Sequence, residues 1–121
     1  MRIKRMDANY TYDSELDIIN IQVKQEYTYH ESIDLDVGVF LDFDDSYFPV
    51  NLEIVDASRR IGVEKEFFTS PDGNVTILIK DDSIEVNVCF KNKSEGHVLK
   101  YVNKHFENQS IPNLETDFAL I

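Results

Sequence analysis

Residues 34–44, DLDVGVFLDFD, alternate apolar and acidic side chains almost without interruption. Successive side chains of an extended chain point to opposite faces, so this period of two predicts a strand with one apolar and one acidic face. Only Phe40 places an apolar side chain on the acidic face. The apolar row consists of Leu35, Val37, Val39, Leu41 and Phe43, and the acidic row of Asp34, Asp36, Asp42 and Asp44.

The same period recurs along most of the chain, in pairs of segments separated by residues that favour turns. The turn at 44–46, DDS, contains short side-chain oxygens that bond nearby backbone amides, and 70–73, SPDG, is a strong turn signal. The paired segments are residues 9–12 with 19–23, 34–44 with 50–54, and 75–79 with 84–90. We therefore predict three consecutive antiparallel hairpins.

The period changes in residues 95–107, where apolar side chains gather on one side of a helical wheel and Ser94 is suited to the N-cap. A strand remains an alternative here, because Gly96 is a poor helix former. Residues 118–121 predict an additional edge strand. The resulting fold class is α+β and mainly β: an antiparallel sheet of consecutive hairpins with one C-terminal helix.

The composition is that of one folded domain, which we place at residues 1–121. The chain has 121 residues, 42% of them hydrophobic, with only four Gly and three Pro. Its single cysteine, Cys89, cannot form an intramolecular disulfide, and no signal peptide or membrane-length apolar segment is visible. We therefore expect a cytoplasmic protein that does not bind a membrane.

The negative charge is concentrated in the first half of the chain. The net charge is −11, and residues 1–58 carry 13 acidic and 4 basic side chains, whereas residues 59–121 carry 10 and 8. Residues 25–58 contain no Lys or Arg. Nucleic-acid binding depends on clustered cations, so we expect none here. An acidic surface of this kind favours a basic protein partner instead.

Three blocks of this sequence resemble the domain-of-unknown-function family 2283. Its members read YDxExDxLYI, GVxxDYDxxG and xGIEILDAS, and here the corresponding residues are 10–21, YTYDSELDIINI, 38–44, GVFLDFD, and 52–58, LEIVDAS. The turn glycine of the family is replaced near Ser46-Tyr47. The resemblance implies a compact, mostly β module of prokaryotes and supplies no catalytic or ligand-binding residues. It divides the chain into an acidic hairpin module, 9–60, and a hairpin with a helical extension, 61–121.

Two arrangements of the acidic residues suggest a cation site. Asp42, Asp44, Ser46 and Glu53 fall at calcium-loop positions, but such a loop requires Gly where Tyr47 stands, so an ordinary acidic hairpin explains the count better. A looser divalent-cation site on the acidic row is the second arrangement, because like charges on one face need compensation. Its candidate ligands are Asp34, Asp36, Asp42 and Asp44.

No catalytic arrangement is recognisable, and we expect neither an enzyme nor a cofactor. The chain lacks HExxH, GxSxG, GxxxxGK[ST] and CxxC. Cys89 with His97 or His105 could form a thiol–imidazole pair, but a lone cysteine in a strand is more often a small apolar filler. His30 is most simply a loop residue.

The leading functional hypothesis is a self-associating β-rich module that forms a homodimer. One helix covers only two or three strands, so a second subunit is expected to cover the rest of the sheet. Phe40 on the acidic face and Tyr47-Phe48 at the turn are the predicted interface. The alternatives are an acidic protein, antitoxin-like or a nucleic-acid mimic, that neutralises a basic partner, and a divalent-cation-binding module.

Overall fold

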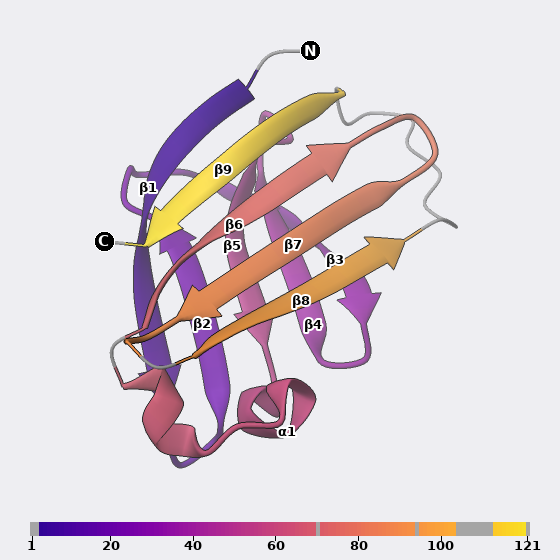
Figure 1. The fold of residues 1–121 in the computed structure, drawn as a ribbon. Helices are drawn as coiled ribbons and strands as arrows, with labels where there is room; N and C mark the ends of the chain where they lie inside the picture. Colours follow the sequence, from indigo (N-terminus) through magenta and orange to yellow (C-terminus); the bar gives the residue numbers. More distant parts are fainter. Residues whose placement is uncertain (1–2, 70, 94, 104–112, 121) are drawn as a thin grey trace.

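The computed structural model describes residues 3–69, 71–93, 95–103 and 113–120. In these ranges the chain is nearly all β, and nine strands form one sheet in the order β3-β4-β5-β2-β1-β9-β6-β7-β8 (Figure 1). The strands are β1 (Ile3–Asp13), β2 (Ile18–Val23), β3 (Tyr29–Asp36), β4 (Val39–Asp44), β5 (Pro49–Ile54), β6 (Asp72–Ile79), β7 (Ile84–Lys91), β8 (Gly96–Asn103) and β9 (Leu114–Leu120).

The predicted hairpins are present as antiparallel pairs, but residues 34–44 are not the single strand that the sequence predicted. The chain turns at residues 37–38, so residues 34–36 end β3 and residues 39–44 form β4, and Val37, predicted in the apolar row, is 86% exposed in the turn. Within each strand, the alternation decides which side chains enter the core. In β4 the buried residues are Val39, Leu41 and Phe43, while the residues between them are half-buried on the outer face. β6 and β7 alternate in the same way. The apolar rows of both halves of the sheet therefore line one shared interior.

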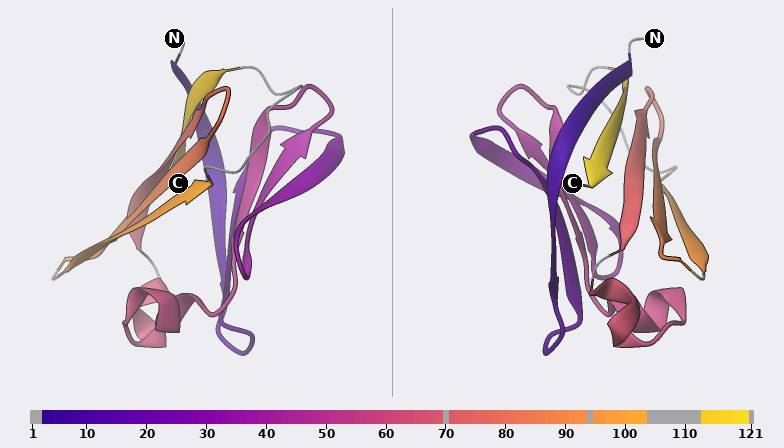
Figure 2. Two further views of the ribbon diagram at one scale, coloured as in Figure 1. Left: turned by 90° about the vertical axis from the view of Figure 1, so that its right-hand side faces the viewer. Right: turned by 60° about the vertical axis from the view of Figure 1, so that its left-hand side comes forward.

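The last strand joins the two halves of the sheet. β9 pairs parallel with β1 and antiparallel with β6, so it lies in the middle of the sheet. Thr116 is buried there, and its Oγ1 donates a hydrogen bond to the carbonyl oxygen of Lys4 at 2.7 Å. The two halves then fold over one another, as both views in Figure 2 show.

The sheet is nearly closed into a barrel, because its two end strands approach each other. Some Cα atoms of β3 and β8 lie within 8 Å, and Asn103 Nδ2 donates to the carbonyl oxygen of Asp34 at 3.3 Å. No backbone pairing between β3 and β8 occurs in the described residues. In these residues the gap between β3 and β8 is therefore bridged by this side-chain hydrogen bond and not by a ladder of backbone hydrogen bonds.

Two short helical segments cover one end of the barrel. They are α1 (Ala57–Ile61) and the 3-10 helix η1 (Lys65–Phe68), which follow β5 (Figure 1). Phe68 is fully buried and packs edge-on against Phe90, with 5.9 Å between ring centroids. Within the described ranges, neither segment nor any other helix has the length and apolar character of a membrane span.

These observations correct the predicted fold class. The described part of residues 95–107 is a strand, β8, and its pairing with β7 runs from Gly96 to Asn103, so the predicted C-terminal helix is wrong there. Residues 104–107 lie outside the described residues. The predicted edge strand at 118–121 is a central strand as far as Leu120, and residue 121 is not described. The fold is a nearly closed β sheet with minor helical segments.

Candidate functional site

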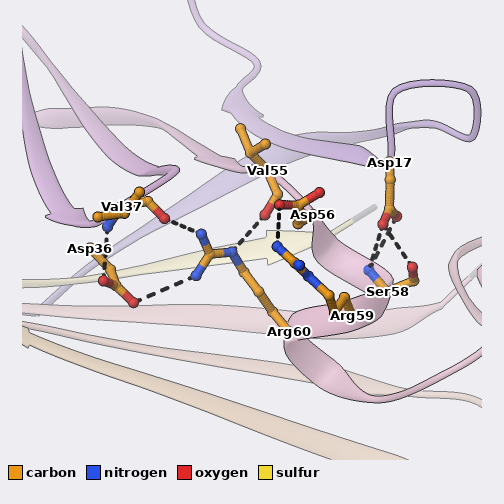
Figure 3. Close-up of polar contacts among 8 residues, drawn as sticks. All are labelled: Asp17, Asp36, Val37, Val55, Asp56, Ser58, Arg59 and Arg60. Carbon is orange, nitrogen blue, oxygen red and sulfur yellow. Dashed lines mark hydrogen bonds and ion pairs between the residues drawn. The ribbon is translucent and has the colours of Figure 1, made fainter.

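A cluster of hydrogen bonds holds α1 against the turn between β1 and β2. Asp17, in that turn, accepts hydrogen bonds from Tyr12 Oη at 2.6 Å and from Ser58 Oγ at 2.7 Å. The backbone amide of Ser58 also donates to the carboxylate, at 3.1 and 3.2 Å (Figure 3). The carbonyl oxygen of Asp17 accepts from the amide of Ala57 at 3.0 Å. Asp17 therefore joins two parts of the chain that are 41 residues apart.

The protonation of this cluster suits a structural role. Burial raises the pKa of Asp17, but hydrogen bonds from Tyr12 and Ser58 and the charge of Lys65 outweigh that effect, so the pKa is lowered overall. Burial and the hydrogen bond to Asp17 raise the pKa of Tyr12 well above its usual value. Asp17 is thus charged and Tyr12 neutral near pH 7, and neither group titrates there.

Arg60 forms the second attachment of α1, to the turn between β3 and β4. Its Nε donates to the carbonyl oxygen of Val55 at 2.6 Å, and its Nη2 donates to the carbonyl oxygen of Val37 (Figure 3). Its Nη1 lies 3.5 Å from Oδ2 of Asp36. Gly38 leaves room for this guanidinium, since a Cβ atom there would lie 2.7 Å from Nη2. Asp36 is therefore an ion-pair partner of Arg60.

The other predicted cation ligands serve different neighbours. Asp42 accepts hydrogen bonds from Ser32 Oγ on one oxygen and from Asn51 Nδ2, at 3.0 Å, on the other. Asp44 Oδ1 caps its own turn by accepting the amides of residues 46 and 48, both at 2.9 Å. Asp34 is exposed opposite residue 40. Among the described residues, no group of three or more His, Cys, Asp or Glu side chains could hold a metal ion.

The three predicted interface residues are half-buried, and two of them have partners within the chain. The rings of Tyr47 and His30 have centroids 5.0 Å apart, and Tyr47 Oη lies 3.1 Å from Nε2 of His30. Lys4 Nζ lies 4.7 Å from the ring centroid of Phe48, a cation–π geometry. Phe40 lies on the outer face of β4, opposite Asp34 on β3 and opposite Glu53 on β5.

The candidate thiol–imidazole pair is not assembled with His97. Cys89 is opposite Val98 in the pairing of β7 and β8, whereas His97 is opposite Phe90. Neighbouring positions of a strand point to opposite faces, so the thiol and this imidazole lie on different sides of the sheet. His97 instead pairs with Glu95 at 3.0 Å. The other candidate, residue 105, lies outside the described residues.

Sequence reasoning missed an apolar strip on the outer face of β8. Val98 is 66% exposed and Val102 is 39% exposed, and half-buried Cys89 lies beside Val98 on β7. Reading residues 95–107 as a helix assigned both valines to a buried face. In a strand, Val98, Lys100 and Val102 lie on one face, because they are two positions apart. This spacing of two was the signal that could have identified the strip.

The comparisons with known proteins bear on the first half of the chain. Neither the curated proteins nor the solved structures give a match. The attachments of α1 through Asp17, Ser58 and Gly38 all involve residues inside the three sequence blocks that suggested a family, so those blocks build one structural junction. Residues 9–58 match the family described as protein of unknown function (DUF2283), which confirms the resemblance that the sequence predicted for this segment.

Proposed function

We propose that the protein is a non-enzymatic β module that forms a homodimer through the outward face of β7 and β8. The observation that supports it is the apolar strip, in which Val98 and Val102 are exposed on an end strand of the sheet. Isolated apolar side chains on a surface are ordinary, but valines repeated along an end strand favour association. The sheet covers its own core, so a second subunit is not needed to cover it, and the proposed dimer rests on the strip instead.

Charge also favours this face for contact between two copies. Residues 59–121 carry a net charge of −2, against −9 for residues 1–58, so two copies repel least through their second halves. Between the two valines, Lys100 Nζ pairs with Glu85 Oε1 at 2.7 Å. A two-fold axis near this pair would bring the lysine of each copy toward the glutamate of the other. The face therefore carries both charges of an ion pair that two copies would exchange across the axis.

The test is the mass of the intact protein in solution, measured by light scattering over a dilution series. Val98→Thr combined with Val102→Thr keeps β-branched side chains in the strand while making the strip polar. Leu16→Ser is the control, because Leu16 is 65% exposed in the β1–β2 turn, away from the strip. We expect dimers for the wild type and the control, and monomers for the double variant.

Either of two results would overturn the proposal: a wild type that stays monomeric at its highest soluble concentration, or a double variant that dimerises like the wild type. The melting temperature of each variant is measured alongside, to confirm that the monomers are folded. Cys89, the single cysteine, suits a reducing compartment, and we place this function in the cytoplasm.

A second candidate function is the binding of a basic protein by the acidic outer face of β3, β4 and β5. The pairing registers put Asp34 and Glu53 on either side of Phe40. An aromatic ring flanked by carboxylates suits an arginine or lysine side chain, which can contact the ring face and pair with an acid. Residues 25–58 contain no Lys or Arg, so no cation within this segment compensates the negative charge.

An oligo-arginine peptide is the probe for this second function, with binding measured by calorimetry at low and high salt. Asp34→Asn with Glu53→Gln removes two charges beside Phe40, and Asp81→Asn with Asp82→Asn removes two exposed charges from the β6–β7 turn. We expect only the first pair to weaken binding strongly, and salt to weaken it in the wild type. Equal weakening by both pairs would mean attraction to overall charge and would exclude a site at Phe40.

A further inference from the structure

A hollow of about 570 Å³ opens beside the outer face of β1 and β2, where the connection to β3 passes. This volume lies within the range of small-molecule sites, roughly 300–1,000 Å³. Its walls combine two tyrosines with three amide side chains, all from the first half of the chain. These five residues are Asn9, Gln22, Gln25, Tyr27 and Tyr29.

Two of these amide side chains are held in place on neighbouring strands. Asn9 and Gln22 are opposite each other in the pairing of β1 and β2, and both are exposed on the outer face. Gln22 Nε2 donates a hydrogen bond to Tyr27 Oη at 2.6 Å. A side-chain amide has two N–H donors and a carbonyl acceptor, and a phenol can accept and donate, so this bond orients both groups while leaving further capacity.

Tyr29 is an exposed aromatic ring whose direction is fixed by other side chains. It is 58% exposed, yet its Oη lies 2.9 Å from Ser32 Oγ. Ser32 donates in turn to Asp42, whose second oxygen accepts from Asn51 Nδ2 at 3.0 Å. These hydrogen bonds already restrict the ring in the free protein. Less side-chain entropy is therefore lost when a ligand packs on the ring.

The charge around the hollow disfavours an anionic ligand. Lys24 and Glu26 both line it, so their opposite charges largely balance at this point. The surrounding half of the chain has a net charge of −9, which repels phosphates and other anions. The groups that remain for recognition are aromatic faces, amides and phenolic hydroxyls.

We propose that this hollow binds a neutral saccharide. Sugars present an apolar C–H face, which packs on an aromatic ring, together with hydroxyl groups that both donate to and accept from amides. Tyr29 supplies the fixed ring, and Asn9 and Gln22 supply the amides at its side. This inference is independent of the dimer and of the basic partner, because it uses neither the β8 strip nor the acids beside Phe40.

Saturation-transfer difference NMR on the full chain is the test, with maltose, cellobiose, lactose and N,N′-diacetylchitobiose as separate probes. We expect transfer to the protons of at least one disaccharide, and binding about tenfold weaker in Tyr29→Ala, which removes the ring. Tyr29→Phe keeps the ring and should retain most of the binding. Gln22→Ala should also weaken it, whereas Val98→Thr, on β8, should leave it unchanged.

The backbone amide spectrum of each variant is recorded first, so that loss of binding is read only from folded protein. Absence of transfer to all four sugars in the wild type would overturn the proposal. Transfer that persists unchanged in both Tyr29→Ala and Gln22→Ala would overturn the placement of the site. Preferential transfer to adenosine, added as a neutral planar competitor, would overturn the ligand class.

Discussion

At the scale of single residues, the clearest conformational cost lies at Tyr47. Its φ is +59°, a left-handed conformation that non-glycine residues adopt at a cost of about 1 kcal/mol or more. Counting from Gly38, Tyr47 occupies the position of the last glycine in the family pattern GVxxDYDxxG. The contact with His30 offsets part of this cost in the present chain.

We therefore predict that Tyr47→Gly is more stable than Tyr47→Ala by about 1 kcal/mol, because both remove the same side-chain contacts and only glycine relieves the backbone. Chemical denaturation at equilibrium measures the difference. Equal stability of the two variants, or a more stable alanine variant, would contradict a strained residue at this turn.

Asp17 makes a different contribution, which depends on ionisation. Asp17→Asn removes the charge that accepts hydrogen bonds from Tyr12 and Ser58, and we expect a loss of about 1–3 kcal/mol at neutral pH. Folding lowers the pKa of Asp17 below its ordinary value of 3.8. Its contribution is therefore present above that value and is lost as the pH falls below it.

The corresponding measurement is the free energy of unfolding of the wild type and of Asp17→Asn as the pH is lowered from about 6 to about 3. The difference between the two proteins should shrink in the acid part of this range, because protonated Asp17 loses the advantage of its charge. A difference that stays constant, or that grows toward acid, would contradict a lowered pKa.

At the scale of the elements, the register of β6 and β7 depends on a glycine. Gly73 is opposite Phe90, and a Cβ atom there would overlap the carbonyl oxygen of Cys89. Gly73→Ala must therefore shift the backbone, and we expect it to destabilise the protein by about 2 kcal/mol or more. The control is Gly96→Ala in β8, where the nearest atom would be 3.7 Å away.

Thermal unfolding of both glycine variants separates the two cases. The β8 variant should melt close to the wild type, since a Cβ atom at residue 96 makes an ordinary contact and alanine in a strand is tolerated. If the two variants have the same melting temperature, the close approach of β6 to β7 is not the reason for glycine at residue 73. Both variants leave the family-matched segment, residues 9–58, unchanged.

The elements that sequence could predict are those with one apolar and one polar face. β4 is the clearest case, because Leu41 and Phe43 alternate with Asp42 and Asp44. β8 was mistaken for a helix because it carries apolar residues on both faces, so the same residues also form a cluster on a helical wheel. The central place of β9 was not predictable, since its pairing with β1 joins residues more than a hundred positions apart.

The candidate cation site shows the same limit at the level of side chains. Asp34 and Asp42 share the outer face, as alternation predicts, but they lie on neighbouring strands, β3 and β4, and not along one strand. Alternation gives no information about the neighbours that use their oxygens, such as Ser32 and Asn51 around Asp42. The pairing of β3 with β4 also shifts register between Asp34 and Asp36, just before the residue that pairs with Arg60. Such β-bulges leave little trace in the sequence.

At the scale of the whole molecule, the nearly closed sheet carries two outer surfaces of different charge, which meet where β3 and β8 approach each other. The outer face of β3, β4 and β5 belongs to the half with a net charge of −9, and the apolar strip of β8 to the half with −2. A dimer through β7 and β8 would therefore lie beside β3, at one border of the acidic face. The hollow beside β1 and β2 belongs to the middle of the strand order, away from the two end strands.

The same asymmetry predicts how the stability responds to salt. A chain with a net charge of −11 repels itself when folded, so added NaCl should raise the melting temperature until the charges are screened. Asp45→Lys reverses an exposed charge next to Asp44 in the acidic half and should raise the melting temperature at low salt. Asp81→Lys makes the same change beside Lys80, and there we expect a smaller gain or a loss.

Scanning calorimetry in buffers of low and high NaCl concentration tests this directly. The difference between the two lysine variants should be largest at low salt and should nearly vanish at high salt, because screening removes the local field that distinguishes the two sites. Equal gains at both sites would show that only the total charge matters. A difference in melting temperature that persists at high salt would point to a local contact of one lysine. Repulsion among the acidic side chains of one half of the sheet cannot cause it, because high salt screens that repulsion.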